Sequence, residues 1–503
     1  MPEPGLTVTM SGALVSETGP LRRLMSSSML YAATGLLQQL VGFLLIPVYT
    51  RLIPPAEYGV LELLTAFLGV AMMCVTLGMS SAINKVYHRD CETPEQRRAV
   101  LSTAMLTVLP AMLLLCAAML ALARPASALL TGSEEHAGLL RIAAASSICY
   151  SLFALVLGGF RAEERVRAYS TLSIVQFSLA LVLNLTLVVG ARLGVRGVLL
   201  GNLTANAGAL VVGLVLLGPG RRLAFDRRLV TPLLAFGIAV VPSMLSGWVM
   251  DVSDRYLLRL FRDLDEVAQY AVGYKFGLAV QLLVTWPFQL AWPAIAFGIS
   301  REEGHERTYA RVLTYLVLVL TFILLGVTAA STSVLPVLVG EAYVVGCTVV
   351  PIIAAAYALN ALQYCVSPGI HIGGRTRALS IVAVVAAAAN LVFGLLLIPS
   401  LGMIGAAWAT VCAYALAVAG AIWLAQRSHP VRYEYGRLAR IAAAGLVTWG
   451  VMRLASAESA GWWLIVEQAG VLLAFPLLVV LSGFVTKEER AQLAAFLQRS
   501  AQA

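Results

Sequence analysis

The run ALSIVAVVAAAANLVFGLLLIPSLGMIGAAWATVCAYALAVAGAIWL, residues 378–424, contains no charged side chain and is long enough to cross a bilayer twice. A segment in hydrocarbon must satisfy its own backbone hydrogen bonds, so such a run predicts membrane-spanning helices. Similar runs fill most of the 503 residues, of which 60% are hydrophobic and 12% are charged. Soluble proteins carry about 25% charged residues. The composition therefore excludes a soluble, disordered, coiled-coil or disulfide-rich secreted protein.

The apolar runs predict an all-α polytopic membrane protein with about 14 transmembrane helices, each of ~20 residues or more. The predicted spans are residues 27–50, 58–84, 99–123, 138–160, 168–190, 195–217, 229–251, 267–297, 312–330, 346–366, 378–398, 402–425, 438–456 and 462–484. The thirteenth is the weakest, because Arg440 and Arg453 must both extend to the interfaces. Most of the 35 basic residues fall on one side of these spans, which predicts that both termini are cytoplasmic.

The two halves of the chain carry similar residues in the same order, at an offset of roughly 200–210 residues. The paired marks are Asn184, Gly194 and Gly197 in the first half and Asn390, Gly402 and Gly405 in the second. Six spans per half predict a parallel repeat of two six-helix lobes around a central cavity, in pseudo-two-fold symmetry, with two extra C-terminal helices. The expected organisation is a cytoplasmic tail at 1–25, an N-lobe at 26–217, a cytoplasmic linker at 218–228, a C-lobe at 229–425, two helices with a preceding cytoplasmic loop at 426–484 and a cytoplasmic tail at 485–503.

Polar residues inside the spans are candidates for function, because a buried polar group in a membrane is costly. Lys275 lies about 13 Å inside the eighth span, which is deeper than a lysine reaches by extending to the interface. It therefore faces an anion, or it belongs to a structural ion pair with Asp251 or Glu62. The other polar stripes either line a cavity or pack helices together. The candidate cavity residues are Lys275, Arg255, Gln38, Gln39, Trp286, Gln289, Asp251 and Asp254.

Asp254 and Arg255 stand at the outer end of the seventh span, where they either line an outward vestibule or belong to a solvated, self-paired loop. Asp251 and Glu62 are candidates for a titrating group coupled to a proton or Na⁺ gradient. Pro287 and Pro293 are expected to break the late part of the eighth span. The cysteines show no paired or metal-ligand spacing, so neither a metal nor a cofactor is expected.

Several stretches resemble the Wzx-type polysaccharide biosynthesis flippases. The resemblance rests on LLQQLVGFLLIPVYTRLIPPAEYGVLELL (36–64), LGMSSAINKVYHRD (77–90), GWVMDVSDRYLL (247–258), QYAVGYKF (269–276), QLAWPAI (289–295) and NLVFGLLLIPSLGMIGAAWATVCAY (390–414). It spans nearly the whole chain and follows the family order. It implies the superfamily that also contains multidrug exporters and lipid II flippases, with alternating access between two lobes.

The resemblance further implies a substrate of undecaprenyl-diphosphate-linked oligosaccharide, moved from the inner to the outer leaflet of the bacterial cytoplasmic membrane for O-antigen, capsule or exopolysaccharide synthesis. The family cavity is basic, so Lys275 and Arg255 are expected to bind the diphosphate. The glutamines and Trp286 are expected to contact hydroxyls and sugar faces. The first span offers Gln38 and Gln39 instead of a cation, which argues against the lipid II branch. The expected partners are the lipid-linked substrate, membrane lipid and polysaccharide-assembly proteins such as a polymerase, with no nucleic acid.

Four other functions remain open. A cation-coupled exporter of small organic molecules on the same fold would favour acidic and aromatic cavity residues, and a lipid II flippase would favour arginines. A membrane polymerase or ligase would need a large outer loop with arginine or histidine, whereas the outer loops here are short, so we do not expect an enzyme. A scaffold for a polymer-synthesis complex is the fourth interpretation.

Overall fold

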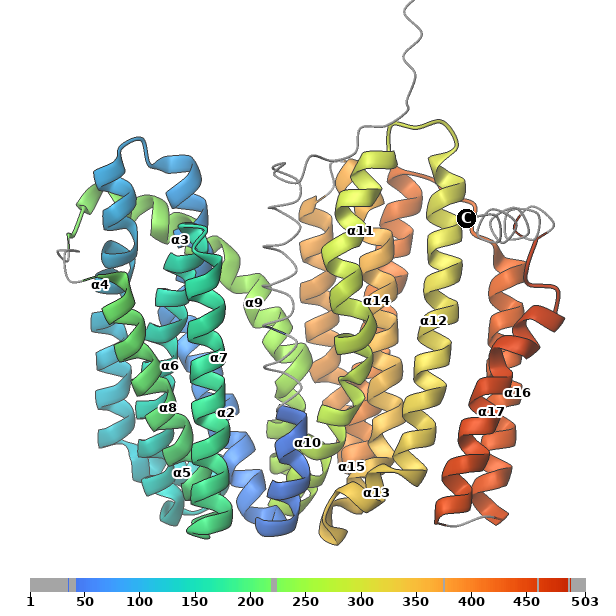
Figure 1. Ribbon diagram of the computed structural model, residues 1–503, viewed down its shortest axis with the longest axis horizontal. Helices are drawn as coiled ribbons and strands as arrows, with labels where there is room; N and C mark the ends of the chain where they lie inside the picture. The colour runs from blue at the N-terminus through green and yellow to red at the C-terminus, as the bar shows by residue number, and fades with distance from the viewer. Residues whose placement is uncertain are drawn as a thin grey trace, which may run out of the picture.

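The computed structural model describes residues 42–218, 224–373, 376–458 and 461–486, together with Gly35 and Glu489. Across these residues the chain is helical and has no strand, and 12 of its helices are long and apolar enough to cross a membrane. The prediction of an all-α polytopic membrane protein is therefore confirmed. Figure 1 shows two groups of upright helices, with α9 (Arg227–Phe261) running obliquely between them.

The first group contains seven α-helices. They are α2 (Pro55–Thr76), α3 (Met79–Lys85), α4 (Pro94–Ala121), α5 (Ala123–Thr131), α6 (Ala137–Ala162), α7 (Val166–Leu185) and α8 (Gly194–Leu217). A short apolar helix, Gly42–Leu52, precedes them. Short π-helical segments extend α3 at Val86–Asp90 and α7 at Thr186–Gly190, and a 3₁₀ turn at Glu134–His136 leads into α6.

The second group follows α9. It contains α10 (Leu264–Gly277), α11 (Trp286–Ile299), α12 (His305–Ser333), α13 (Leu335–Leu338), a 3₁₀ segment (Glu341–Val349), α14 (Val350–Ile372) and α15 (Thr376–Ser428). The last two helices, α16 (Tyr435–Glu458) and α17 (Trp462–Leu481), stand at the outer edge beside α12 (Figure 1).

The helix count of fourteen stays a prediction, although each difference from it has a visible reason. The first predicted span, 27–50, lies mostly outside the described residues. The eleventh and twelfth spans form the single element α15, which is broken at Gly402 (φ 57°, ψ −135°). The weak thirteenth span is the complete helix α16. The expected lobe and tail boundaries also stay predictions.

The eighth predicted span is interrupted earlier than expected. Helix α10 ends at Gly277, a π-helical segment covers Gln281–Thr285, and α11 begins at Trp286. The irregular segment thus lies directly before Pro287, and α11 continues through Pro293 without a break. A break at Pro293 is therefore not found, and a role of Pro287 in the interruption stays a prediction.

The two helix groups meet where α2 and α10 begin, the end that the predicted topology assigns to the outside. A Cβ atom at Gly59 would collide with the backbone carbonyl of Leu264, so α2 and α10 touch through their backbones there. The Tyr343 hydroxyl donates to the Ile53 carbonyl at 2.8 Å, and the Gly340 N–H donates to Thr50 Oγ1 at 3.1 Å. Direct backbone contacts therefore hold this end together.

The marks of the predicted repeat occupy similar local structures. Gly194 (φ 52°) and Gly402 (φ 57°) both adopt the left-handed conformation at a tight turn between two helices. A Cβ atom at Gly197 would lie 3.1 Å from the Leu187 backbone, and one at Gly405 would collide with the Leu397 backbone. The parallel arrangement of two lobes nevertheless stays a prediction.

Candidate functional site

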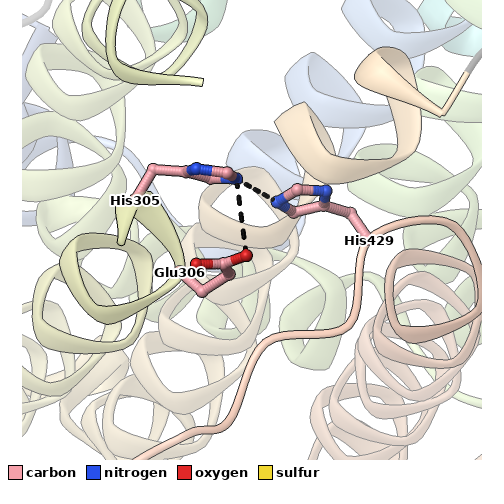
Figure 2. A group of neighbouring side chains, drawn as sticks. All are labelled: His305, Glu306 and His429. Carbon is pink, nitrogen blue, oxygen red and sulfur yellow. Dashed lines mark hydrogen bonds and ion pairs between the residues drawn. The ribbon is translucent and has the colours of Figure 1, made fainter. Parts of the chain in front are cut away.

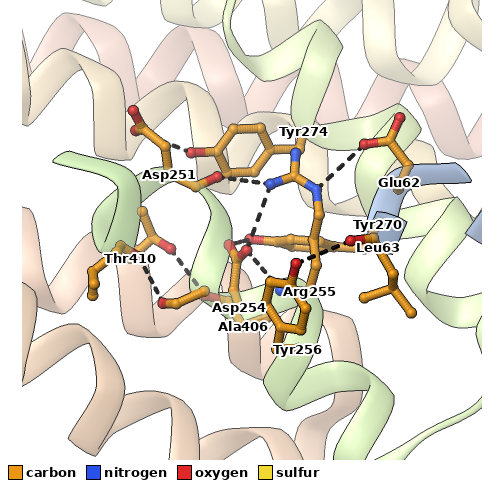
Figure 3. A network of polar contacts seen from close by, with 12 residues as sticks. Glu62, Leu63, Asp251, Asp254, Arg255, Tyr256, Tyr270, Tyr274, Ala406 and Thr410 are labelled. Carbon is orange, nitrogen blue, oxygen red and sulfur yellow. Dashed lines mark hydrogen bonds and ion pairs between the residues drawn. The ribbon is translucent and has the colours of Figure 1, made fainter. Parts of the chain in front are cut away.

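Five charged side chains gather in the described part of the chain where the two helix groups meet. They are Glu62 on α2, Asp251, Asp254 and Arg255 on α9, and Lys275 on α10. The three residues of α9 share one helical face through their spacing of three and four. Figure 3 shows the Arg255 guanidinium between Glu62, Asp251 and Asp254. Asp254 and Arg255 are only 2% and 6% exposed, so their charges depend on each other for compensation.

Lys275 turns toward α2. Its Nζ lies 2.5 Å from Glu62 Oε1 and donates to the Tyr58 hydroxyl at 2.7 Å. It also lies 5.1 Å from the centre of the Tyr58 ring. Of the two ion pairs that the sequence left open, the structure contains the one with Glu62.

Arg255 completes a second link to the same carboxylate. Its Nε lies 3.5 Å from Glu62 Oε2, and its Nη1 donates to the Asp251 carbonyl at 2.8 Å. The guanidinium carbon stands 4.9 Å from the centre of the Tyr274 ring. Among the described residues Nε has no hydrogen-bond partner, although it is buried. Glu62 therefore joins α2 to both α9 and α10 by charge, and one guanidinium donor remains available.

Asp254 and Arg255 do not belong to a solvated loop. Helix α9 continues to Phe261, and α10 covers this face with tyrosines. The Tyr270 hydroxyl donates to Asp254 Oδ2, and the Arg255 backbone N–H donates to Asp254 Oδ1 at 2.9 Å. The solvated-loop interpretation is thus wrong because a second helix packs over these residues, whereas the outward vestibule stays a prediction.

Asp251 sits in a cage of tyrosines. The hydroxyls of Tyr357, Tyr274 and Tyr414 lie 3.0, 3.4 and 3.5 Å from its Oδ1. These rings come from α14, α10 and α15, and each stands inside an apolar stretch of sequence. Sequence reasoning missed them because tyrosine is a common packing residue, and only the fold brings the three hydroxyls to one carboxylate.

A cavity of about 280 Å³ opens beside Asp251 and Arg255. Gln281 and Trp286 also form its wall. Lys275 is not among its lining residues, although the sequence predicts one stripe for Lys275 and Trp286. The π-helical segment between them changes the helical register, so the two side chains face different neighbours.

A further predicted cavity residue, Gln289, lies elsewhere. Gln289 stands further along α11, where its side chain bonds with Tyr364 of α14. Gln38 and Gln39 lie outside the described residues.

A larger cavity, of about 580 Å³, lies within the first helix group. Its polar lining residues are Thr65, Thr76, Ser80, Ser81, Ser146, Ser147, Tyr150, Ser151, Gln176, Asn202 and Asn206. Its described lining includes no Asp, Glu, Lys or Arg. Sequence reasoning missed this cavity because its hydroxyls come from several spans; the available signal was the intramembrane amides of Gln176, Asn202 and Asn206.

The larger cavity and the charged cluster are adjacent. Thr65 lies one turn from Glu62 on α2, and Met244, which closes the cavity from α9, lies two turns from Asp251. The cluster contains two cations and three carboxylates, and the larger cavity is neutral. The basic cavity implied by the resemblance is therefore not what the described residues form.

The sequence matches a known family over more than half of its length. Residues 24–297 match the family described as "Polysaccharide biosynthesis protein". An uncharacterized membrane protein of Methanocaldococcus jannaschii is 25% identical over 213 residues, which cover 40% of each chain. The chain thus spans well under two thirds of that curated relative.

Solved structures share the fold at low identity. A structure of the lipid II flippase MurJ in an inward closed conformation has a TM-score of 0.71 and 13% identity, covering 91% of this chain and 98% of that one. An inward-facing multidrug resistance transporter of the MATE family has a TM-score of 0.58 and 15% identity over 78% and 98% of the two chains. The MATE transporter VcmN of Vibrio cholerae has a TM-score of 0.54 and 17% identity over 81% and 96%.

Proposed function

Because the chain belongs to the polysaccharide biosynthesis protein family, whose fold it shares with flippases and exporters, we propose that it moves a lipid-linked oligosaccharide across the bacterial cytoplasmic membrane. The substrate would be an undecaprenyl-diphosphate-linked repeat unit, carried from the inner to the outer leaflet by alternating access. Both termini would be cytoplasmic, and a polymerase and other assembly proteins would use the product. The observation that supports the proposal most is the neutral polar cavity that lies one helical turn along α2 from Glu62, the carboxylate that contacts Lys275 and Arg255.

Lys275 and Arg255 would bind the diphosphate in exchange for the Glu62 carboxylate. Glu62 forms ion pairs with both Lys275 and Arg255, so a phosphate that reached these two cations would replace the Glu62 carboxylate. Arg255 Nε, which makes an ion pair with Glu62 but no hydrogen bond, supplies the first donor for that exchange. Loss of the Glu62 contacts would release α2 from α9 and α10. Substrate binding would thereby weaken the connection that closes the outer end.

The sugars would occupy the larger cavity of the first helix group. Its hydroxyls and amides are the hydrogen-bond partners that sugar hydroxyls require, and its volume of about 580 Å³ is in the range of small-molecule sites. The absence of charge in its described lining suits neutral sugars. The lipid tail would remain in the bilayer, so only the polar head would need shielding from hydrocarbon.

We infer that Asp251 takes the coupling cation. Glu62 is already neutralised by two cations, whereas Asp251 faces tyrosine hydroxyls and a cavity of about 280 Å³. A proton or a small cation at Asp251 would also alter the charge balance around Arg255, whose Nη1 bonds to the Asp251 carbonyl. This links the ion to the residue proposed to receive phosphate.

The test is a deletion strain in which the leaflet of the lipid-linked repeat unit is measured with a membrane-impermeant reagent. The deletion should leave repeat units in the inner leaflet and stop polymer export. Arg255→Gln and Lys275→Ala should reduce export at least tenfold at equal protein level, and Lys275→Arg should restore part of it. Arg453→Gln, on the peripheral helix α16, is the matched control and should export normally.

Two outcomes would count against the proposal. If repeat units reached the outer leaflet normally without the protein, it would not be the flippase. If Arg255→Gln and Lys275→Ala both exported at the control rate, the assignment of the diphosphate to these residues would fail.

A second candidate function has one specific observation in its favour. An acidic residue within an aromatic cage is also a site for organic cations, as Asp251 with Tyr274, Tyr357 and Tyr414 provides. A cation exporter would release a cationic dye from loaded cells, and Asp251→Asn would abolish that release. Unchanged dye retention in the deletion strain would exclude this function for the dye tested.

A further inference from the structure

Three metal-ligating side chains meet at the end of the molecule that the predicted topology assigns to the cytoplasm. His305 and Glu306 begin α12, and His429 directly follows α15 (Figure 2). His305 Nε2 lies 2.7 Å from His429 Nε2 and 3.9 Å from Glu306 Oε1. One ligand atom from each residue lies within 4.8 Å of the others. This site is far along the chain from the charged cluster and plays no part in the proposed transport function.

We propose that His305, His429 and Glu306 bind a zinc ion. Neighbouring ligand atoms of a tetrahedral zinc site are roughly 3.3 Å apart, given Zn–N distances of about 2.0–2.1 Å. The two distances of 2.7 and 3.9 Å lie on either side of this value, so small side-chain rotations would centre an ion. A set of two imidazoles and one carboxylate binds zinc in preference to Mg²⁺. A water molecule would complete the tetrahedron.

The ring of His305 is oriented for ligation. Its Nδ1 lies 2.7 Å from the Glu302 carbonyl, to which it can only donate. In the neutral ring this places the lone pair on Nε2, the atom that faces His429. A carbonyl that fixes the far nitrogen is a common outer partner of metal-bound histidine. Two imidazole nitrogens that face each other need a shared proton, and a metal ion would take the place of that proton.

The polypeptide around the site is held in place by short-range contacts. Gly304, with φ of 80°, caps α12 and makes His305 its first residue. The His429 N–H donates to the Ala425 carbonyl at 2.7 Å, so His429 continues the last turn of α15. The Tyr309 ring stands edge-on to both imidazoles, with centroid distances of 5.7 Å to His305 and 6.0 Å to His429. A preformed ligand set of this kind reduces the cost of ordering on binding.

The site is open to solvent on one side. The side chain of Glu306 is 46% exposed and that of His305 is 14% exposed. An ion can therefore reach the imidazoles past the carboxylate. Bound zinc would connect the start of α12 to the segment between α15 and α16. Sequence reasoning missed this site because the two histidines are 124 positions apart.

The test uses the full chain, purified in detergent with an affinity tag that contains no histidine and stripped with a chelator. Zinc content and thermal unfolding are then measured with added Zn²⁺ or Mg²⁺. We expect about one zinc per chain and a rise in Tm with Zn²⁺ but not with Mg²⁺. His305→Ala and His429→Ala should weaken zinc binding at least tenfold. His88→Ala, which removes an exposed histidine from the same predicted side, should bind zinc like the parent.

A third variant tests the ligand set without disturbing buried contacts. Glu306→Gln keeps the shape of an exposed side chain but removes its charge, so it should weaken zinc binding while leaving the Tm of the metal-free protein unchanged. The proposal is overturned if zinc does not raise the Tm of the parent, or if His429→Ala binds zinc within about threefold of the parent.

Discussion

Glu62 carries the electrostatic connection between the two helix groups, because its carboxylate contacts Lys275 and Arg255 at once. We therefore expect the Glu62→Gln and Lys275→Gln substitutions to be non-additive. Their coupling energy in a double-mutant cycle should be about 1–3 kcal/mol, the range for residues in one buried network. The lower part of the range is the more reasonable, since the Lys275 side chain is 33% exposed and solvent screens the pair. Thermal or denaturant unfolding in detergent measures it.

A second ion pair supplies the control for this cycle. Lys85 and Asp90 are 3.6 Å apart, with side chains 34% and 30% exposed, and both lie on α3 and its π-helical extension. Their coupling should be below about 0.5–1 kcal/mol. Equal coupling in the two cycles would show that the Glu62 pair has no special role in holding the groups together.

The spacing of side chains in the sequence predicted part of the candidate site. The depth of Lys275 identified a buried cation that needs a partner, and the fold supplies that partner in Glu62. Which carboxylate pairs with Lys275 depends on the packing of α2 against α10, and no local sequence pattern predicts that packing. The tyrosines around Asp251 are a stronger example, because they come from three helices separated by long stretches of chain.

Helix α2 approaches α10 through Gly59, and this contact leaves no room for a side chain. We expect Gly59→Ala to destabilise the protein by about 1–3 kcal/mol, because the added methyl must push one backbone away from the other. Gly247→Ala is the matched control: it is also within a long helix, α9, and a Cβ atom there meets nothing within 4 Å. The control should be neutral or slightly stabilising, since alanine favours helix over glycine. Equal Tm values for the two variants would contradict the close contact.

The segment after α17 is fastened to α16 and α12 by one carboxylate. Glu489 contacts Arg437 at 3.1 Å and accepts hydrogen bonds from the Tyr315 hydroxyl at 2.8 Å and the Thr486 N–H at 2.9 Å. Burial would raise the pKa of this carboxyl, but the Thr486 N–H, the Tyr315 hydroxyl and Arg437 together lower it to about 2.

This low pKa makes the attachment acid-sensitive in a defined direction. A carboxyl with a depressed folded-state pKa stabilises the fold above its unfolded value of about 4.3, and that contribution disappears as the pH falls toward 2. Glu489→Gln should remove it at every pH, so the difference in Tm from the parent should be constant above about pH 5 and vanish toward pH 2. A pH-independent difference would show that the carboxylate charge is not responsible.

The sequence predicted the positions of the helices better than the irregular segments within them. Apolar runs located nearly all described spans, because the bilayer fixes the length of each helix. The π-helical segment at Gln281–Thr285, which packs against α14, was not predicted, since QLLVT is an ordinary apolar sequence. Because of this segment, Lys275 and Trp286 face different neighbours. The missed π-helical segment therefore led to the incorrect expectation that both side chains lie on one stripe.

The arrangement of the two helix groups predicts on which side the larger cavity is accessible. Thr50, Ile53 and Gly59 form contacts that close the end assigned to the outside, whereas the cavity residues Ser80 and Ser81 lie beyond the far end of α2. In a background with all native cysteines replaced by alanine, Ser147→Cys should react with a membrane-impermeant maleimide from the cytoplasmic side and not from the outside. Glu135→Cys in the 3₁₀ turn and Glu95→Cys in the first turn of α4, both exposed and assigned to opposite sides, calibrate the labelling.

The same cysteine connects the charged cluster to alternating access. Adding Glu62→Gln removes the carboxylate that holds α2 to Lys275 and Arg255, so the closed outer end should open more often. A loss of about 1.4 kcal/mol from the closed state would raise the population of the open state relative to it tenfold. Labelling of Ser147→Cys from the outside should therefore increase in the Glu62→Gln background, and labelling from the cytoplasm should fall. If outside labelling stayed at the level of the Glu62 parent, the ion pairs would stabilise the fold without controlling access to the cavity.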